Sequence, residues 1–108
     1  MKNDLVLNYS SMLSNIIVDL TYALSDKKDI VEILLALKKS TTRLNRAVRD
    51  AGYAHSLSSM MYKLNTAKWE CNQTRSLVSK LLDLKHITYE MFCSVAEITD
   101  KIHNLLAD

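Results

Sequence analysis

The sequence predicts a single all-α domain over residues 1–108, built as an up-down-up-down bundle of four helices. The chain has no proline and only one glycine, and tight turns of β-rich folds depend on these two residues. Apolar residues recur at steps of three and four along four segments, which is the period of an amphipathic helix. The polar links between those segments are short, so consecutive helices are expected to run antiparallel.

The first helix is expected over residues 3–25. Its apolar side is a stripe that Leu13, Ile17 and Leu24 widen toward the breadth of a core-facing helix. The members of that stripe are Leu5, Tyr9, Met12, Ile16, Leu20 and Ala23. A polar link follows, in which Asp29 is expected to cap the next helix by accepting from exposed backbone N–H groups.

The second helix is expected over residues 29–51. Gly52 is predicted to end it, since glycine adopts the left-handed backbone conformation at little cost. Arg49 in the last turn complements the negative end of the helix dipole. The apolar stripe alternates steps of four and three as a heptad seam does, and it consists of Ile30, Leu34, Leu37, Thr41, Leu44, Val48 and Ala51.

The third helix is expected over residues 56–85, with either Ser56 or Ser58 as its N-cap. The stretch before it is either a loop or a kink. Its stripe is Leu57, Met60, Leu64, Ala67, Cys71, Thr74, Val78 and Leu81. The fourth helix is expected over residues 88–107, where Thr88 is a suitable N-cap. Its stripe is Met91, Val95, Ile98, Ile102 and Leu105, with Leu106 beside it.

Catalytic and metal-binding patterns are not apparent in the sequence. No two histidines share the one-turn spacing that holds a metal from one helix, and one glycine cannot build a phosphate-binding loop. We therefore expect a protein that is not an enzyme and takes no cofactor. The longest apolar run, residues 33–37, is far too short to span a bilayer. With no secretory signal visible, a cytoplasmic location is expected, and Cys71 and Cys93, both on apolar stripes, are expected to be buried free thiols.

The charged side chains are unevenly distributed along the chain. Residues 1–37 carry a net charge of −2 and residues 86–108 a net charge of −3. Residues 38–85 hold ten basic and three acidic side chains, a net charge of +7. Any polyanion is therefore expected to meet the middle of the chain.

The densest positive charge lies on the second helix, on the side opposite its apolar seam. We call these five residues the basic stripe: Lys38, Lys39, Arg43, Arg46 and Arg49. Such a stripe can bind phosphates, and it can also be a solvated helix face or pair with the acidic first and fourth helices. Trp69 lies beside the third apolar stripe, where it either covers the flank of the core or anchors an interface.

The second half of the chain carries the residues on which a resemblance to known proteins is based. They form the pattern Leu57-x-x-Met60-Met61-x-x-Leu64-x-x-Ala67, then LLDLKHITYE over residues 81–90, then Val95-x-Glu97-Ile98-x-x-x-Ile102. This pattern resembles the accessory variability proteins (Avd) of diversity-generating retroelements. It is also similar to the related four-helix-bundle proteins encoded in ribosomal RNA intervening sequences.

The resemblance implies a homopentamer whose positive surface binds template RNA and the reverse transcriptase of the retroelement. The basic stripe matches the basic helix of that family. The leading hypothesis is thus a non-catalytic accessory protein that oligomerises and binds RNA. The alternative is a purely structural or protein-binding bundle with no nucleic-acid role.

Overall fold

The computed structural model describes residues 3–107. All of the regular secondary structure in this range is helical. A short 3₁₀ turn, η1, comes before the second of four α-helices. The elements are α1 (Asn3–Ala23), η1 (Lys28–Ile30), α2 (Val31–Gly52), α3 (Leu57–Asp83) and α4 (Tyr89–Ala107). The predicted four-helix fold is confirmed, and every helix boundary lies within two residues of the expected one. None of these helices is long and apolar enough to cross a membrane.

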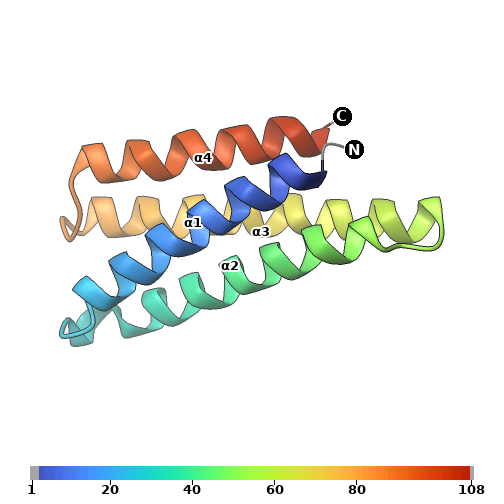
Figure 1. Cartoon of the computed structure of the whole chain (residues 1–108). Coiled ribbons are helices and arrows are strands. Elements are labelled where there is room, and N and C mark those ends of the chain that lie inside the picture. The colour runs from blue at the N-terminus through green and yellow to red at the C-terminus, as the bar shows by residue number, and fades with distance from the viewer. Residues whose placement is uncertain (1–2, 108) are drawn as a thin grey trace.

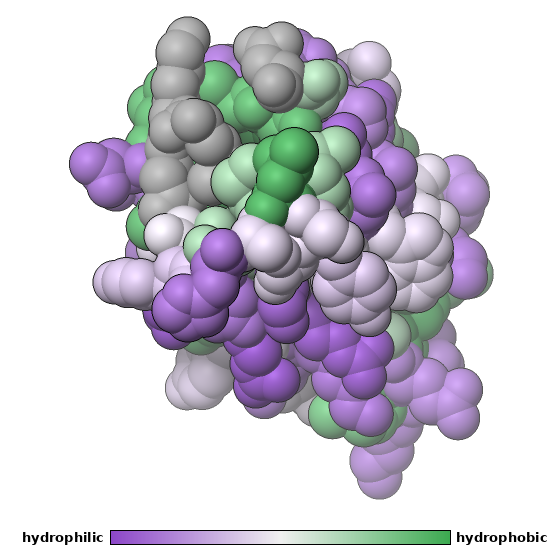
Figure 2. Space-filling model, turned by 90° about the vertical axis from the view of Figure 1, so that its right-hand side faces the viewer, coloured by the Kyte–Doolittle hydropathy of each residue, from purple (hydrophilic) through white to green (hydrophobic). Residues whose placement is uncertain are grey.

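The helices pack as a ring in which α1 contacts α2 and α4, and α3 contacts the same two helices. The result is an elongated body of 44 × 22 × 18 Å. Figure 1 shows that the α2–α3 hairpin extends beyond the end of the bundle at which α1 begins and α4 ends. Figure 2 looks onto this end, where hydrophilic side chains cover most of the lower part of the face.

Burial follows the predicted stripes closely on α2 and α3. Every residue of the α2 stripe is buried, and so is the α3 stripe from Leu64 to Leu81. Leu57, at the start of the α3 stripe, is instead 71% exposed. The reason is that the protruding hairpin has no third helix to cover it (Figure 1).

The predicted stripe of α1 is displaced around the helix from the observed buried side. Leu5 and Met12 are exposed, although both were expected in the core. The buried side consists of Val6, Ser10, Leu13, Ile17, Leu20, Thr21 and Leu24. This helix carries apolar residues on neighbouring faces, so helical periodicity alone does not choose between two adjacent stripes.

The helix ends confirm two predicted caps and correct two other predictions. Ser56 caps α3 by accepting from the backbone N–H of Ser59 at 3.1 Å, and Thr88 caps α4 by accepting from Met91 N–H at 3.2 Å. Gly52 is the last residue of α2 and does not adopt a positive φ, so the left-handed glycine stop was wrong. Asp29 does not cap α2. Its carboxylate lies 3.3 Å from Nε2 of His86 instead.

The left-handed position occurs at the end of α3, where Lys85 has φ of 64°. The backbone N–H of Lys85 donates to the carbonyl of Leu82 at 2.9 Å, and that of His86 donates to Leu81 at 3.0 Å. This pair of hydrogen bonds is a Schellman motif, which satisfies carbonyls at the helix end. The motif turns the chain sharply and buries Ile87 in the core.

A polar network joins α1 to α2 near the core. Ser10 Oγ donates to Oδ1 of Asn45 at 2.6 Å, and Nδ2 of Asn45 donates to Oγ of Ser14. The same amide also donates to the carbonyl of Thr41 at 3.1 Å. Since these groups satisfy one another, the polar atoms can be buried between the helices at little cost.

Candidate nucleic-acid interface

The basic stripe is exposed along its whole length on α2. The structure divides it between two grooves instead of gathering it in one cluster. Lys38 lines a groove between α2 and α1, whereas Arg43 and Arg46 line a groove between α2 and α3. Lys39 and Arg49 line neither groove, so Arg43 and Arg46 are the part of the stripe that lies beside α3.

None of the five stripe residues lies within ion-pair distance of an acidic side chain in residues 3–107. The pairs that do form involve other cations, among them Lys63 with Asp50 at 3.6 Å and Arg75 with Asp100. Pairing of the stripe with acidic residues of α1 and α4 is therefore not seen within this part of the chain. The stripe's positive charges face water and remain available to an anion.

The groove between α2 and α3 has a volume of ≈ 190 Å³. Its walls are Arg43, Arg46, Ala47 and Asp50 from α2, and Tyr62, Lys63, Thr66 and Glu70 from α3. The Lys63–Asp50 ion pair crosses between the two walls. Three cations and two carboxylates thus converge on one groove.

Glu70 is the unusual member of this groove. The residue is only 4% exposed, and its Oε1 atom is shielded from water without any hydrogen-bond partner in the described chain. Our sequence reasoning missed both Glu70 and Tyr62 as site residues. The sequence offers only the position of Glu70, which follows Ala67 by three residues and so lies at the edge of the α3 apolar stripe, as many ordinary boundary residues do.

Two aromatic side chains of α3 are exposed, and one of them, Tyr62, lines this groove. Tyr62 is 69% exposed and Trp69 is 57% exposed. They are seven residues apart, which places them on one side of the helix about 10 Å apart along its axis. The Lys63 ammonium lies 6.0 Å from the Tyr62 ring centroid. We call Arg43, Arg46, Tyr62, Lys63 and Trp69 the aromatic–basic face.

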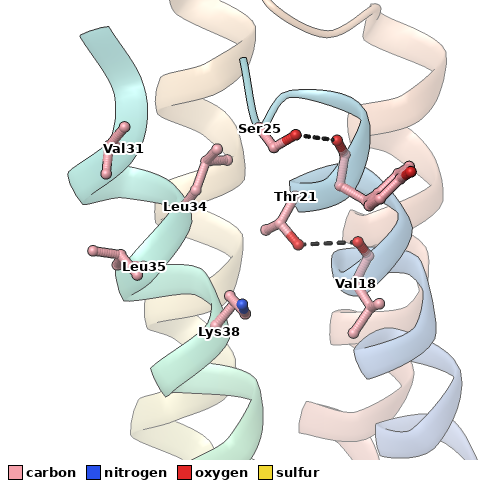
Figure 3. A pocket seen from close by; sticks show the side chains of 8 residues that line it. Val18, Thr21, Ser25, Val31, Leu34, Leu35 and Lys38 are labelled. Carbon is pink, nitrogen blue, oxygen red and sulfur yellow. Dashed lines mark hydrogen bonds between the residues drawn. The ribbon is translucent and has the colours of Figure 1, made fainter. Parts of the chain in front are cut away.

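A second, apolar groove lies between α1 and α2 and has a volume of ≈ 350 Å³. Val31, Leu34, Leu35 and Lys38 line it from α2, and Figure 3 shows Leu34 and Lys38 on the side of α2 toward α1. Val18, Tyr22, Val31 and Leu35 are all exposed, Tyr22 to 83%. Large apolar side chains gathered on one surface are typical of sites where another molecule packs.

The two cysteines are free, and they differ in environment. Cys71 is buried, and its thiol donates to the carbonyl of Thr99 at 3.3 Å. Burial, together with the nearby Asp100 carboxylate, raises the pKa of Cys71 to about 11. Cys93 is exposed, so the expectation that both thiols are buried was wrong for this one. Across residues 3–107, no three His, Cys, Asp or Glu side chains are grouped as metal ligands would be.

Comparison with solved structures shows that the same fold occurs in a protein of known structure. A crystal structure of a protein of unknown function from the S23 ribosomal protein family of Bacteroides thetaiotaomicron superposes with a TM-score of 0.91. The two sequences are 27% identical, and the match covers 99% of this chain and 96% of the other. No family model and no curated protein sequence matches the chain. The structural match supports the resemblance to intervening-sequence bundles, and it lends no support to the link with accessory variability proteins.

Proposed function

We propose that the chain is a non-catalytic accessory protein that binds RNA through the aromatic–basic face. The observation that carries the proposal is that Arg43 and Arg46 are exposed beside a groove, with no acidic partner among residues 3–107. Guanidinium groups suit bidentate contacts with phosphate oxygens. Exposed aromatic rings next to cations suit the stacking of unpaired bases.

The finer form of the proposal follows from the sequence resemblance. It adds a homopentamer and a reverse transcriptase as the protein partner, as in diversity-generating retroelements. An oligomer repeats the aromatic–basic face around its axis, and repeated weak sites raise the total affinity for one RNA strand. Measurement of the mass in solution tests this part, and a monomeric mass would contradict it.

Titration of a fluorescent single-stranded RNA across a series of salt concentrations tests RNA binding. Phosphate contacts release counterions, so the logarithm of the association constant falls linearly with the logarithm of the salt concentration, by about 0.7 per contact for single strands. Replacing both Arg43 and Arg46 by alanine is expected to weaken binding and to reduce that slope by about 1.4.

A matched control removes two positive charges elsewhere, at Lys28 and Lys101. Lys28 lies in η1 and Lys101 on α4, both away from the groove. The control variant has the same net charge as the arginine variant, so it corrects for the overall field of the protein. Equal affinities and equal slopes for the two variants would show that the aromatic–basic face is not the RNA site.

The alternative function is a protein-binding bundle, and the apolar groove between α1 and α2 favours it. An exposed apolar surface loses contact with water when a partner covers it. Leu35→Asp is then expected to abolish self-association or partner binding. If wild-type protein binds no RNA at low salt and Leu35→Asp alone disrupts an assembly, the alternative is correct.

A further inference from the structure

We propose that the α2–α3 groove recognises an unpaired guanine base through Glu70. This inference rests on the proposed RNA binding and specifies what the aromatic–basic face recognises. The starting observation is the buried carboxylate, whose Oε1 has no hydrogen-bond donor within residues 3–107. Buried acceptors are nearly always satisfied, and Glu70 lines the groove, so a donor that enters the groove can supply the missing hydrogen bond.

The charges around the groove decide what kind of donor fits. Arg43, Arg46 and Lys63 outnumber the two carboxylates of Asp50 and Glu70. Asp50 is already paired with Lys63 at 3.6 Å. A metal ion or a basic side chain of a partner protein would therefore meet net positive charge on its way to Glu70. A neutral base tied to a negative phosphate avoids that repulsion, because its N–H groups face Glu70 while the phosphate faces the arginines.

The size of the groove agrees with a single flat base. A volume of ≈ 190 Å³ is below the range of about 300–1,000 Å³ that is usual for sites of drug-sized ligands, so the groove suits a small group such as one base. The neighbouring wall residues can hold such a ring, since Tyr62 offers an aromatic face and Thr66 a hydroxyl group. The last torsion of a glutamate is broad, so either oxygen of Glu70 can turn toward the groove.

Among the four bases, the hydrogen-bonding edge of guanine matches a carboxylate best. Its Watson–Crick edge has two adjacent donors, N1–H and the 2-amino group, and an ionised carboxylate has two acceptor oxygens and no donor. Adenine and cytosine place a single amino donor beside a ring acceptor, and uracil places its one donor between two carbonyls. Each of these presents an acceptor that would face the Glu70 carboxylate.

Binding of short single-stranded RNAs tests the inference. The probes are a uridine oligomer of about nine nucleotides and the same oligomer with one central guanosine, adenosine or inosine. Inosine lacks the 2-amino group of guanosine and is otherwise the same base. We expect the guanosine oligomer to bind wild-type protein about tenfold more tightly than the uridine oligomer, and inosine to lose most of that gain.

The variant Glu70→Gln keeps the shape of the side chain but replaces one acceptor by a donor. It is expected to bind all four oligomers with similar affinity, close to that of wild-type protein for uridine. Glu97→Gln on α4 is the matched control, because it removes the same charge from an exposed position and should keep the guanosine preference. Far-ultraviolet circular dichroism of both variants confirms that the bundle is folded.

The outcomes separate this inference from the proposed function. If the salt-dependent RNA affinity persists but all bases bind equally to wild-type protein, the guanine site is wrong and RNA binding stands. If no oligomer binds at low salt, both proposals are wrong. If bases are not distinguished and an arginine-containing peptide binds in a Glu70-dependent way, the groove is a docking site for a protein partner, which also overturns the guanine site.

Discussion

The Schellman motif at the end of α3 gives a sharp test of how this fold is stabilised. Lys85 has φ of 64°, and for a residue with a Cβ atom the left-handed region costs about 1–2 kcal/mol. Glycine carries no such penalty, although its greater conformational freedom in the unfolded chain reduces the gain in stability by about 0.5–1 kcal/mol. Replacing Lys85 by glycine also removes a positive charge at the negative end of the helix dipole, an interaction of about 0.3–1 kcal/mol.

The variant Lys85→Ala separates the charge from the backbone. It loses the charge of Lys85 but keeps the Cβ atom, so it also keeps the steric penalty. We therefore expect Lys85→Gly to be more stable to unfolding than Lys85→Ala by about 1 kcal/mol. For a domain of this size that difference corresponds to a melting temperature about 4 °C higher. Thermal unfolding followed by circular dichroism at neutral pH measures it.

Lys80 supplies the control, because it is exposed in the last turn of α3. Its backbone is helical, so glycine there should be less stable than alanine by about 1 kcal/mol. The order of stability of the glycine and alanine variants is thus expected to be opposite at positions 80 and 85. If glycine is the less stable residue at both positions, the left-handed conformation of Lys85 is not what governs this helix end.

Three further predictions concern the thiols and the polar network. Iodoacetamide at pH 8 should modify Cys93 quickly and Cys71 only after unfolding, as peptide mass mapping would detect, because the pKa of Cys71 is raised to about 11. That raised pKa stabilises the fold fully below the ordinary thiol pKa of 9.0, and the contribution is lost as pH rises toward 11. The stability difference between wild type and Cys71→Ala should therefore narrow over that interval in urea titrations. Asn45→Ala leaves two α1 serines without their amide partner and should cost about 1–3 kcal/mol in urea unfolding, whereas Asn65→Ala on the exposed side of α3 should be neutral or slightly stabilising.

The sequence predicted the fold well where helical periodicity was unambiguous. On α2 the polar residues leave a single apolar seam, and every residue from Ile30 to Ala51 in that seam is buried. On α1 two adjacent stripes are both apolar, and only the packing of α2 and α4 against it selects Val6 and Leu13 over Leu5 and Met12. Periodicity shows which sides of a helix are apolar, but packing against the adjacent helices determines which of those sides is buried.

The candidate site was less predictable because it is formed between helices. Arg43 and Arg46 could be chosen from the charge pattern of one segment. Their partners Tyr62 and Glu70 come from another helix, and the antiparallel register of α2 and α3 brings them together. A glutamate beside an apolar stripe looks like an ordinary boundary residue in sequence. Its lack of a hydrogen-bond partner is a property of the packed groove alone.

The groove between α2 and α3 departs from rules that much of the described chain obeys. Helix caps and polar networks elsewhere satisfy the polar groups that they join, as Ser56, Thr88 and Asn45 illustrate. Within residues 3–107, Oε1 of Glu70 is buried without a hydrogen-bond partner, and Arg43 and Arg46 are exposed without acidic partners. Sequences that fold reliably tend to break such rules at functional sites, where a ligand supplies the missing contact. A single ligand that is anionic at one end and a hydrogen-bond donor at the other would pair with both the arginines and the Glu70 carboxylate. An RNA nucleotide has that character.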